Sequence, residues 1–351
     1  MKTFLKLSIM IFLTAFAAEM QAAVNEYTRV IKKEFTVNPD ARLTVSNKFG
    51  KIHCTNWDKN IVGIEVQVVV ETSNDNKAAK MLESIDVSFN ASASLVEATT
   101  VFEEMHNSGR NNSFKVDYFI NLPAGMNLDL ANKFGDIYVN EINGKAKIDL
   151  SYGNLDINKL NNSDNLIDLK FCNSSKVREI KGAVINLQYS TLDIDYAGSL
   201  RLDAKYSNLK AGKVIALNLS TQGGSVDLSN SAAVESRSRF SDIDIDRIDQ
   251  SLNLDIQYGS CKVSEVGVDF TSINIKNKFA DVDLRLPKSA VYSLDATLKF
   301  CELNFPDENA VLNFRSTTPT SSEYRGVVGS KDAKPKATVV VRSNYGSVSL
   351  K

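Results

Sequence analysis

The chain has 351 residues and a formal net charge of −1, from 41 Lys and Arg against 42 Asp and Glu. This balance excludes the net basic surface with which a nucleic-acid-binding domain holds phosphates. A hydrophobic content of 43% excludes a highly charged disordered chain. The 2 His and 4 Cys residues leave little material for a His-rich metal site.

The first 23 residues resemble a secretory signal peptide. Lys2 and Lys6 form a basic start, the apolar run Leu7–Ala18 follows, and small residues behind it offer cleavage sites. The run is shorter than the ~20 residues that cross a bilayer, and no comparable run occurs later. We therefore predict an exported protein, periplasmic, extracellular or at the cell surface, that spans no membrane after leader removal. An N-terminal membrane anchor is the alternative.

The cysteines do not form a disulfide framework. An exported protein lies in an oxidising compartment that permits disulfides. However, the sequence has no C-x-x-C pair. The four cysteines lie within the repeats or in strand-like runs, at Cys54, Cys172, Cys261 and Cys301. Because free Cys is among the most buried residue types, we predict that they are small core residues.

The most informative feature is an internal repeat: an aromatic residue, a small residue, one further residue and an aliphatic residue. Through the middle of the chain it recurs every 17 to 21 residues. Its aromatic positions are Phe134, Tyr152, Phe171, Tyr189, Tyr206, Phe240, Tyr258, Phe279 and Phe300. Gly223 keeps the spacing but breaks the aromatic rule, and further copies of the motif begin at Phe49 and Tyr345.

Around each aromatic residue, apolar and polar residues alternate, as at Leu128 and Leu130 before Phe134. This alternation predicts strands with one buried face, so each repeat consists of two short strands joined at a corner. One unit cannot bury its apolar face alone, whereas stacked units share a continuous core. We predict an all-β fold, a parallel β-helix or β-solenoid of about ten layers, in which strand twist favours right-handed winding. A sandwich of β-hairpins is the alternative.

The repeats predict four parts along the chain. These are a signal peptide at 1–23, an N-terminal β-rich cap at 24–123, the β-solenoid at 124–305, and an irregular loop with closing strands at 306–351. The cap holds one predicted helix, Asp75–Ser84, with Asn74 or Asp75 as its N-cap. In the last part, Thr317–Ser322 and Gly326–Pro335 are predicted loops.

Several segments carry a family resemblance: Leu43–Ile52, Trp57, Val116–Pro123 and Leu128–Ile137. With the helix insert, they resemble the putative-adhesin proteins of bacterial envelopes, a domain-of-unknown-function β-solenoid family related to the head domain of autotransporter adhesins. The resemblance implies the fold and an envelope location, and it supplies no catalytic residues. The chain departs from the family by carrying Ala, Ser or Cys in place of the corner Gly in several layers.

No nucleophile elbow, zinc-protease motif or phosphate-binding loop occurs in the sequence, so we predict no catalytic, cofactor-binding or metal-binding residue. His53 is predicted as a surface strand residue, and His106 lies in a polar loop. Asp227 and Asp244 fall on adjacent layers, where paired carboxylates suit Ca²⁺ or a sugar, although a solvated ladder of mixed charges is favoured.

Aromatic residues offer a second candidate surface. Five tyrosines are considered for a glycan platform, at Tyr138, Tyr189, Tyr196, Tyr206 and Tyr258. Most of them are corner residues, and packed corner rings are favoured over such a platform.

Together these features predict a non-enzymatic envelope protein, an adhesin or scaffold whose rigid surface binds glycan or protein partners. One alternative is a polysaccharide lyase or hydrolase, with Arg201, Arg237, Arg239 and Asp242–Asp246 in a cleft under the 103–113 loop. Another is a periplasmic sensing or signalling partner of a membrane protein. No cofactor and no nucleic-acid partner is expected.

Overall fold

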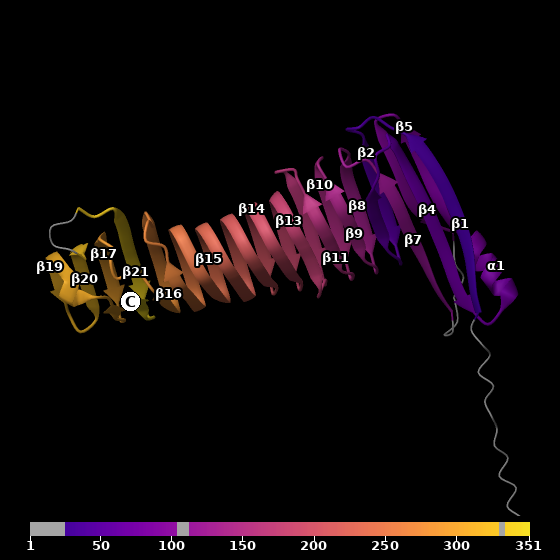
Figure 1. Cartoon of the computed structure of the whole chain (residues 1–351). Helices are drawn as coiled ribbons and strands as arrows, with labels where there is room; N and C mark the ends of the chain where they lie inside the picture. Colours follow the sequence, from indigo (N-terminus) through magenta and orange to yellow (C-terminus); the bar gives the residue numbers. More distant parts are fainter. Residues whose placement is uncertain (1–24, 104–111, 330–333) are drawn as a thin grey trace, which may run out of the picture.

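The computed structural model describes residues 25–103, 112–329 and 334–351. The predicted signal peptide at 1–23 and the loop residue His106 lie outside this part of the chain. Its 22 β-strands belong to one hydrogen-bonded sheet, accompanied by one α-helix and one short 3-10 turn. Figure 1 shows the strands side by side along an elongated body, from β1 at one end to β19 at the other. The prediction of an all-β fold is confirmed.

The N-terminal part contains seven strands and the helix. They are β1 (Asn25–Thr36), β2 (Arg42–Lys48), β3 (Ile52–Asn56), β4 (Ile61–Thr72), α1 (Asp75–Glu83), β5 (Ile85–Ser92), β6 (Leu95–Phe102) and β7 (Ser113–Leu122). The pairs β1–β4, β4–β7 and β5–β6 are antiparallel. Among the described residues, no helix is long and apolar enough to cross a bilayer.

Helix α1 forms where the sequence predicts it. The side chain of Asn74 caps it by accepting a hydrogen bond from the backbone N–H of Lys77, an interaction worth about 1 kcal/mol. Its buried residues Ala78 and Met81 form a small cluster with Val70 of β4. The helix therefore covers the flank of the N-terminal strands.

The middle of the chain contains nine strands. They are β8 (Asn127–Lys133), β9 (Ile137–Ile142), β10 (Ala146–Ser151), β11 (Leu155–Leu160), β12 (Asn165–Lys170), β13 (Ser175–Gln188), β14 (Thr191–Lys205), β15 (Asn208–Val266) and β16 (Ser272–Leu284). Strands from successive repeats pair in parallel: Ile148 lies opposite Leu130 on one side and opposite Ile167 on the other. The strands after the corners pair in the same way, with Ile157 opposite Val177. Each strand therefore pairs in parallel with the equivalent strand of the next repeat. The antiparallel pairing expected of a hairpin sandwich does not occur between these strands.

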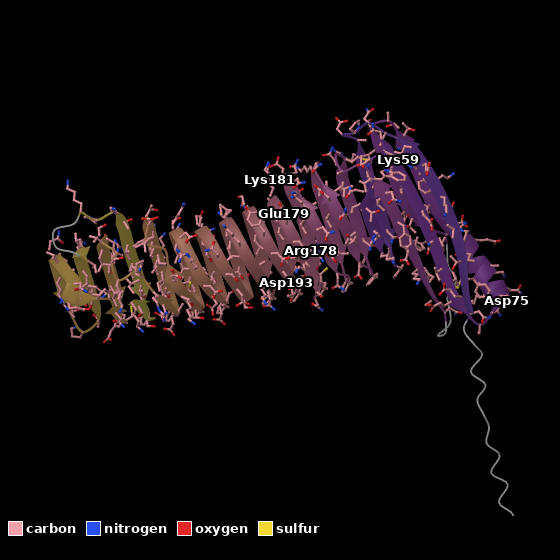
Figure 2. All side chains as sticks on the ribbon, viewed as in Figure 1. Lys59, Asp75, Arg178, Glu179, Lys181 and Asp193 are labelled. Carbon is pink, nitrogen blue, oxygen red and sulfur yellow. The ribbon has the colours of Figure 1, made fainter. Side chains whose placement is uncertain are left out.

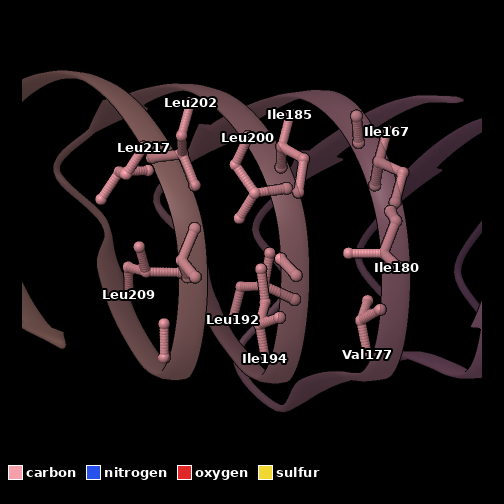
Figure 3. Packing of buried hydrophobic residues seen from close by; sticks show 14 of the residues in the cluster. Ile167, Val177, Ile180, Ile185, Leu192, Ile194, Leu200, Leu202, Leu209 and Leu217 are labelled. Atoms are coloured by element: carbon pink, nitrogen blue, oxygen red, sulfur yellow. The ribbon is translucent and has the colours of Figure 1, made fainter. Parts of the chain in front are cut away.

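The core runs inside the winding ribbon. Figure 3 shows Ile185 and Leu202 on one wall and Val177 and Ile194 on another, all with their side chains inside. These four side chains are at most 2% exposed. Burying one such side chain contributes about 1.5–3 kcal/mol, so the columns are the main source of stability.

The cysteines belong to this core. Cys54, Cys172 and Cys261 are buried, Cys301 is half-buried, and all four are free thiols. The prediction that they are core residues is confirmed for the first three.

The C-terminal part contains six strands. They are β17 (Tyr292–Lys299), β18 (Leu303–Asn304), β19 (Ala310–Thr317), β20 (Ser321–Val328), β21 (Ala337–Asn344) and β22 (Val348–Leu350), with the 3-10 turn at Asp307–Asn309. The loops predicted at Thr317–Ser322 and Gly326–Pro335 are wrong in part, because β19 extends to Thr317 and β20 covers Ser321–Val328, pairing antiparallel with β17 and β19. Residues 318–320 connect the two strands, and residues 330–333 lie outside the described part of the chain. Strand β19 is mostly exposed and β20 mostly half-buried, so the apolar alternation that reveals a half-buried strand is weak there.

The last strands do not close the end of the stack. Strand β21 lies between β16 and β17, with Val341 opposite Ile275 on one side and opposite Ala296 on the other. The β19–β20 hairpin occupies the end instead (Figure 1). At the other end, β2 pairs directly with β8, so the Phe49 layer adjoins the Phe134 layer despite the long insert between them.

Candidate functional site

The corner residues form a row of stacked rings, interrupted once at Gly223, which we call the aromatic ladder. Its members are Phe49, Phe134, Tyr152, Phe171, Tyr189, Tyr206, Phe240, Tyr258, Phe279, Tyr345 and Phe300. Neighbouring rings stack with centroids 4.8–5.4 Å apart. From Phe134 onwards every ring is at least 40% exposed. The corner rings therefore pack on one another while part of each ring stays exposed to solvent.

The backbone explains why these rings point outward. All eleven residues have positive φ, between 50° and 66°. This left-handed conformation turns the chain between the two strands of each layer, and it costs an L-residue about 1–2 kcal/mol. A stacked ring regains about 0.5–1.5 kcal/mol. Asn or Gly would make the same turn with less strain, so corner geometry alone does not require aromatic residues.

A hollow of about 450 Å³ lies beside the ladder, on the strands that precede the corners. Its charged lining residues come from successive layers: Arg201, Asp203, Glu235, Arg237, Asp255 and Lys276. Asn186, Asn218, Ser220 and Asn253 add hydrogen-bonding groups. The lining thus offers both donors and acceptors along several layers.

None of these six charged side chains forms an ion pair with any described residue, although Asp255 lies directly opposite Lys276 on the neighbouring strand. Glu235 accepts a hydrogen bond from Asn218 at 3.2 Å. The hollow is therefore a surface whose charges are available to another molecule.

Some charges elsewhere on the strands pair across layers. The ammonium of Lys159 lies 3.1 Å from the carboxylate of Glu179, and Arg178 pairs with Asp156. Figure 2 shows Arg178 and Glu179 on the outer surface of the strands. Each exposed pair contributes little to stability, in the range of about 0–1 kcal/mol. These pairs contain charges of both signs, as the hollow does, but the six charges of the hollow form no ion pair among the described residues.

One layer of the hollow has a polar core. At the positions where an earlier repeat carries Leu202 and Ala204, the repeat before Phe240 carries Ser236 and Ser238. Both serines are buried and their hydroxyls have no hydrogen-bond partner. Small polar residues at these positions are the sequence signal that distinguishes this layer. Four other lining residues were not identified from the sequence as candidate site residues: Asp203, Glu235, Asp255 and Lys276.

The predicted enzyme residues are only partly brought together. Arg201 and Arg237 line the hollow, whereas Arg239 and Asp242–Asp246 are not among its lining residues. The carboxylates follow Phe240, on the other side of the corner. Most of the predicted 103–113 roof lies outside the described residues. The arrangement thus places no carboxylate from Asp242–Asp246 in the hollow with the arginines.

The metal candidates Asp227 and Asp244 are exposed on β15. Among residues 25–103, 112–329 and 334–351, no group of three or more His, Cys, Asp or Glu could hold a metal ion. His53 is half-buried and stacks on Tyr138 with 4.4 Å between ring centroids. Desolvation, and then the charge of Lys51, lowers the pKa of His53, so its imidazole is neutral at pH 7.

The chain was compared with protein families, curated proteins and solved structures. No family model matches the chain, and no curated protein matches it. The chain is similar to solved structures that are named putative adhesins. These include a putative cell adhesion protein from Clostridium sporogenes, with 10% identity over 92% of this chain and 99% of the other and a TM-score of 0.20. Putative adhesins from Bacteroides fragilis and Parabacteroides merdae share 10% and 11% identity over 92% of this chain and 97% and 96% of theirs, with TM-scores of 0.24 and 0.29. At these TM-scores the similarity says nothing of the ligand.

Proposed function

We propose that this protein is a non-enzymatic, adhesin-like envelope protein whose β-solenoid rod binds a glycan partner through the hollow. In this proposal residues 1–23 direct export, 24–123 cap one end, 124–305 form the rod, and 306–351 complete it. The protein then acts in the periplasm or at the cell surface.

The observation that carries the proposal is the set of unpaired charges in the hollow. Arg201, Arg237 and Lys276 can donate hydrogen bonds to hydroxyls and carboxylates, while Asp203, Glu235 and Asp255 can accept them. Some charges elsewhere on the rod pair with one another, as Lys159 and Glu179 do, whereas the six in the hollow line one cavity without an ion pair among the described residues. A glycan chain lying across the strands would meet one donor or acceptor per layer, at a spacing of about 4.8 Å.

Rigidity supports the same role. The rod presents the hollow on hydrogen-bonded strands rather than on loops, so little conformational entropy is lost when a ligand binds. The parallel pairing of the strands holds the side chains of the hollow at a regular spacing.

A glycan array probed with residues 24–351 tests the proposal. The informative variant carries Glu235→Gln with Arg237→Gln, which leaves the net charge unchanged. Its matched control carries Lys159→Gln with Glu179→Gln, a pair that lies outside the hollow. We expect the hollow variant to lose about tenfold or more in affinity for the selected glycan, and the control to bind like the parent.

Two results would contradict the proposal. One is equal binding by the parent and the hollow variant. The other is turnover of an acidic polysaccharide that depends on Arg237, which would favour a lyase or hydrolase instead.

A further inference from the structure

The aromatic ladder is interrupted once, at Gly223. Strands in neighbouring layers are about 4.8 Å apart, so the rings of Tyr206 and Phe240, two layers apart, flank a space of roughly 10 Å where the repeat places no side chain. Every other pair of adjacent corners on the ladder carries two stacked rings. We call the position beside Gly223 the vacant rung.

The rings on both sides of the vacant rung each lack one neighbour. Phe240 is 62% exposed and Tyr206 is 57% exposed, the highest values on the ladder. Within a stacked row only ring edges meet solvent, whereas these two rings each have an unstacked face. This face is the part of an aromatic ring that binds another ring by stacking.

The ring of Tyr206 lies toward the space beside Gly223. Its centroid lies 5.4 Å from that of Tyr189, the longest spacing between stacked rings on the ladder. Gly223 is buried, and a Cβ built on it would lie 2.9 Å from Cδ1 of Tyr206. The ring of Tyr206 therefore leans over Gly223, and it can return toward Tyr189 when another ring enters.

The backbone at the vacant rung already has the corner conformation. Gly223 has φ of 75°, in the same left-handed region as the aromatic corners. The backbone N–H of Tyr206 donates to the carbonyl of Gln222, as the corner N–H of Phe171 does to Gln188. The layer lacks only a ring.

Two free cations border the space. Lys205 and Arg239 immediately precede Tyr206 and Phe240, both are exposed, and neither forms an ion pair with any described residue.

Two polar side chains that follow the corners already form hydrogen bonds within the protein. Asn208 accepts hydrogen bonds from the N–H and hydroxyl of Ser225, and Asp242 accepts one from the hydroxyl of Ser260. The residues directly before the two flanking rings are therefore both cations without an ion pair among the described residues.

We propose that the vacant rung binds a planar aromatic ring that carries a carboxylate. The ring stacks between Tyr206 and Phe240, and its carboxylate lies toward Lys205 and Arg239. The ligand is a small aromatic acid, since the space accepts one ring and is bordered by charged side chains rather than by an extended apolar surface. This site is separate from the glycan surface and does not depend on it.

Three probes test the proposal in titrations of residues 24–351, followed through the backbone amide signals of Gly223 and Gly224. Benzoate has the ring and the charge, cyclohexanecarboxylate has the charge without the planar ring, and benzylamine has the ring with the opposite charge. We expect benzoate to bind about tenfold more tightly than either of the others. Equal binding of benzoate and cyclohexanecarboxylate, or of benzoate and benzylamine, would overturn the proposal.

Three variants locate the site. Gly223→Tyr supplies the missing ring and should reduce benzoate affinity at least about tenfold. Tyr152→Asn removes a ring elsewhere on the ladder, keeps a corner residue that tolerates positive φ, and should leave the benzoate response of the Gly223 and Gly224 amides unchanged. Arg239→Gln should weaken benzoate while leaving benzylamine unweakened. Benzoate binding that persists in Gly223→Tyr would overturn the proposal.

Discussion

Tyr345 stacks face to face on Phe279, with 4.9 Å between ring centroids and 7° between ring planes. On its other side it stacks on Phe300 at 4.8 Å. The C-terminal segment thus completes a layer inside the row of repeats. Phe279 and Phe300 are neighbouring repeats in the sequence, yet a strand from the end of the chain separates them.

Removal of residues 337–351 should therefore damage the interior of the rod. Without β21 and β22, β16 and β17 lose their parallel partner, and the core around Ile275 and Ala296 becomes exposed. We expect a lower midpoint of thermal unfolding and aggregation in size-exclusion chromatography. Thr338→Ala, at an exposed position of β21, is the control and should behave like the parent. An unchanged midpoint in the truncated chain would contradict the inserted position of β21.

The two neighbouring glycines should respond differently to the same substitution. Gly223→Tyr should change the free energy of unfolding by less than about 1 kcal/mol, because stacking on two faces offsets the cost of about 1–2 kcal/mol for a left-handed L-residue, and only the ring of Tyr206 has to move. Gly224→Tyr should destabilise it by more than about 2 kcal/mol, since its Cβ would lie 2.1 Å from the backbone oxygen of Ser207. Urea unfolding measures both changes. Equal effects of the two substitutions would disagree with the corner geometry.

The buried serines should also respond differently. Ser238→Ala removes a buried hydroxyl that has no partner and should raise the free energy of unfolding by about 1 kcal/mol. Ser241→Ala removes a hydroxyl that donates to the carbonyl of Arg239 at 3.0 Å and contacts Thr221 Oγ1 at 3.2 Å. We expect it to lower the free energy of unfolding by a similar amount, about 1 kcal/mol, in urea titrations. The reverse order would show that Ser238 has a partner in solution.

Stability should fall at alkaline pH because of the buried thiols. Burial raises the pKa of Cys54 and Cys261 to about 12. Below the unfolded pKa of about 8.5 the thiols are neutral in both states; above it the unfolded chain loses protons that the folded chain keeps. Each thiol should therefore remove roughly 1 kcal/mol per pH unit between about pH 9 and pH 11.

Denaturant titrations of a Cys54→Ala, Cys261→Ala variant check this expectation. Its stability should decline less steeply with pH than that of the parent. The matched control is Cys301→Ala, at a half-buried position. Identical slopes in the parent and the double variant would argue against buried neutral thiols.

Repeat spacing was enough to predict the layers, the inward columns such as Leu130 and Ile148, and the capped helix after Asn74. These features depend on local periodicity and capping, which neighbouring residues carry. The direction of the corner rings was not predicted, because the aromatic residues signal burial unless their positive φ is known. A small residue directly after each ring, as Gly135 follows Phe134, is the signal that indicated a tight corner.

The place of β21, the hairpin at the end and the charged hollow depend on pairing between segments far apart in the chain. Strand order is set by which edges meet and bury surface together, and residues 337–350 carry the same alternating pattern wherever they pair. The hollow needs side chains from several layers, so no single stretch of sequence contains it. Local chemistry thus specifies each unit of this protein, whereas contacts between distant units set their order and create the charged hollow.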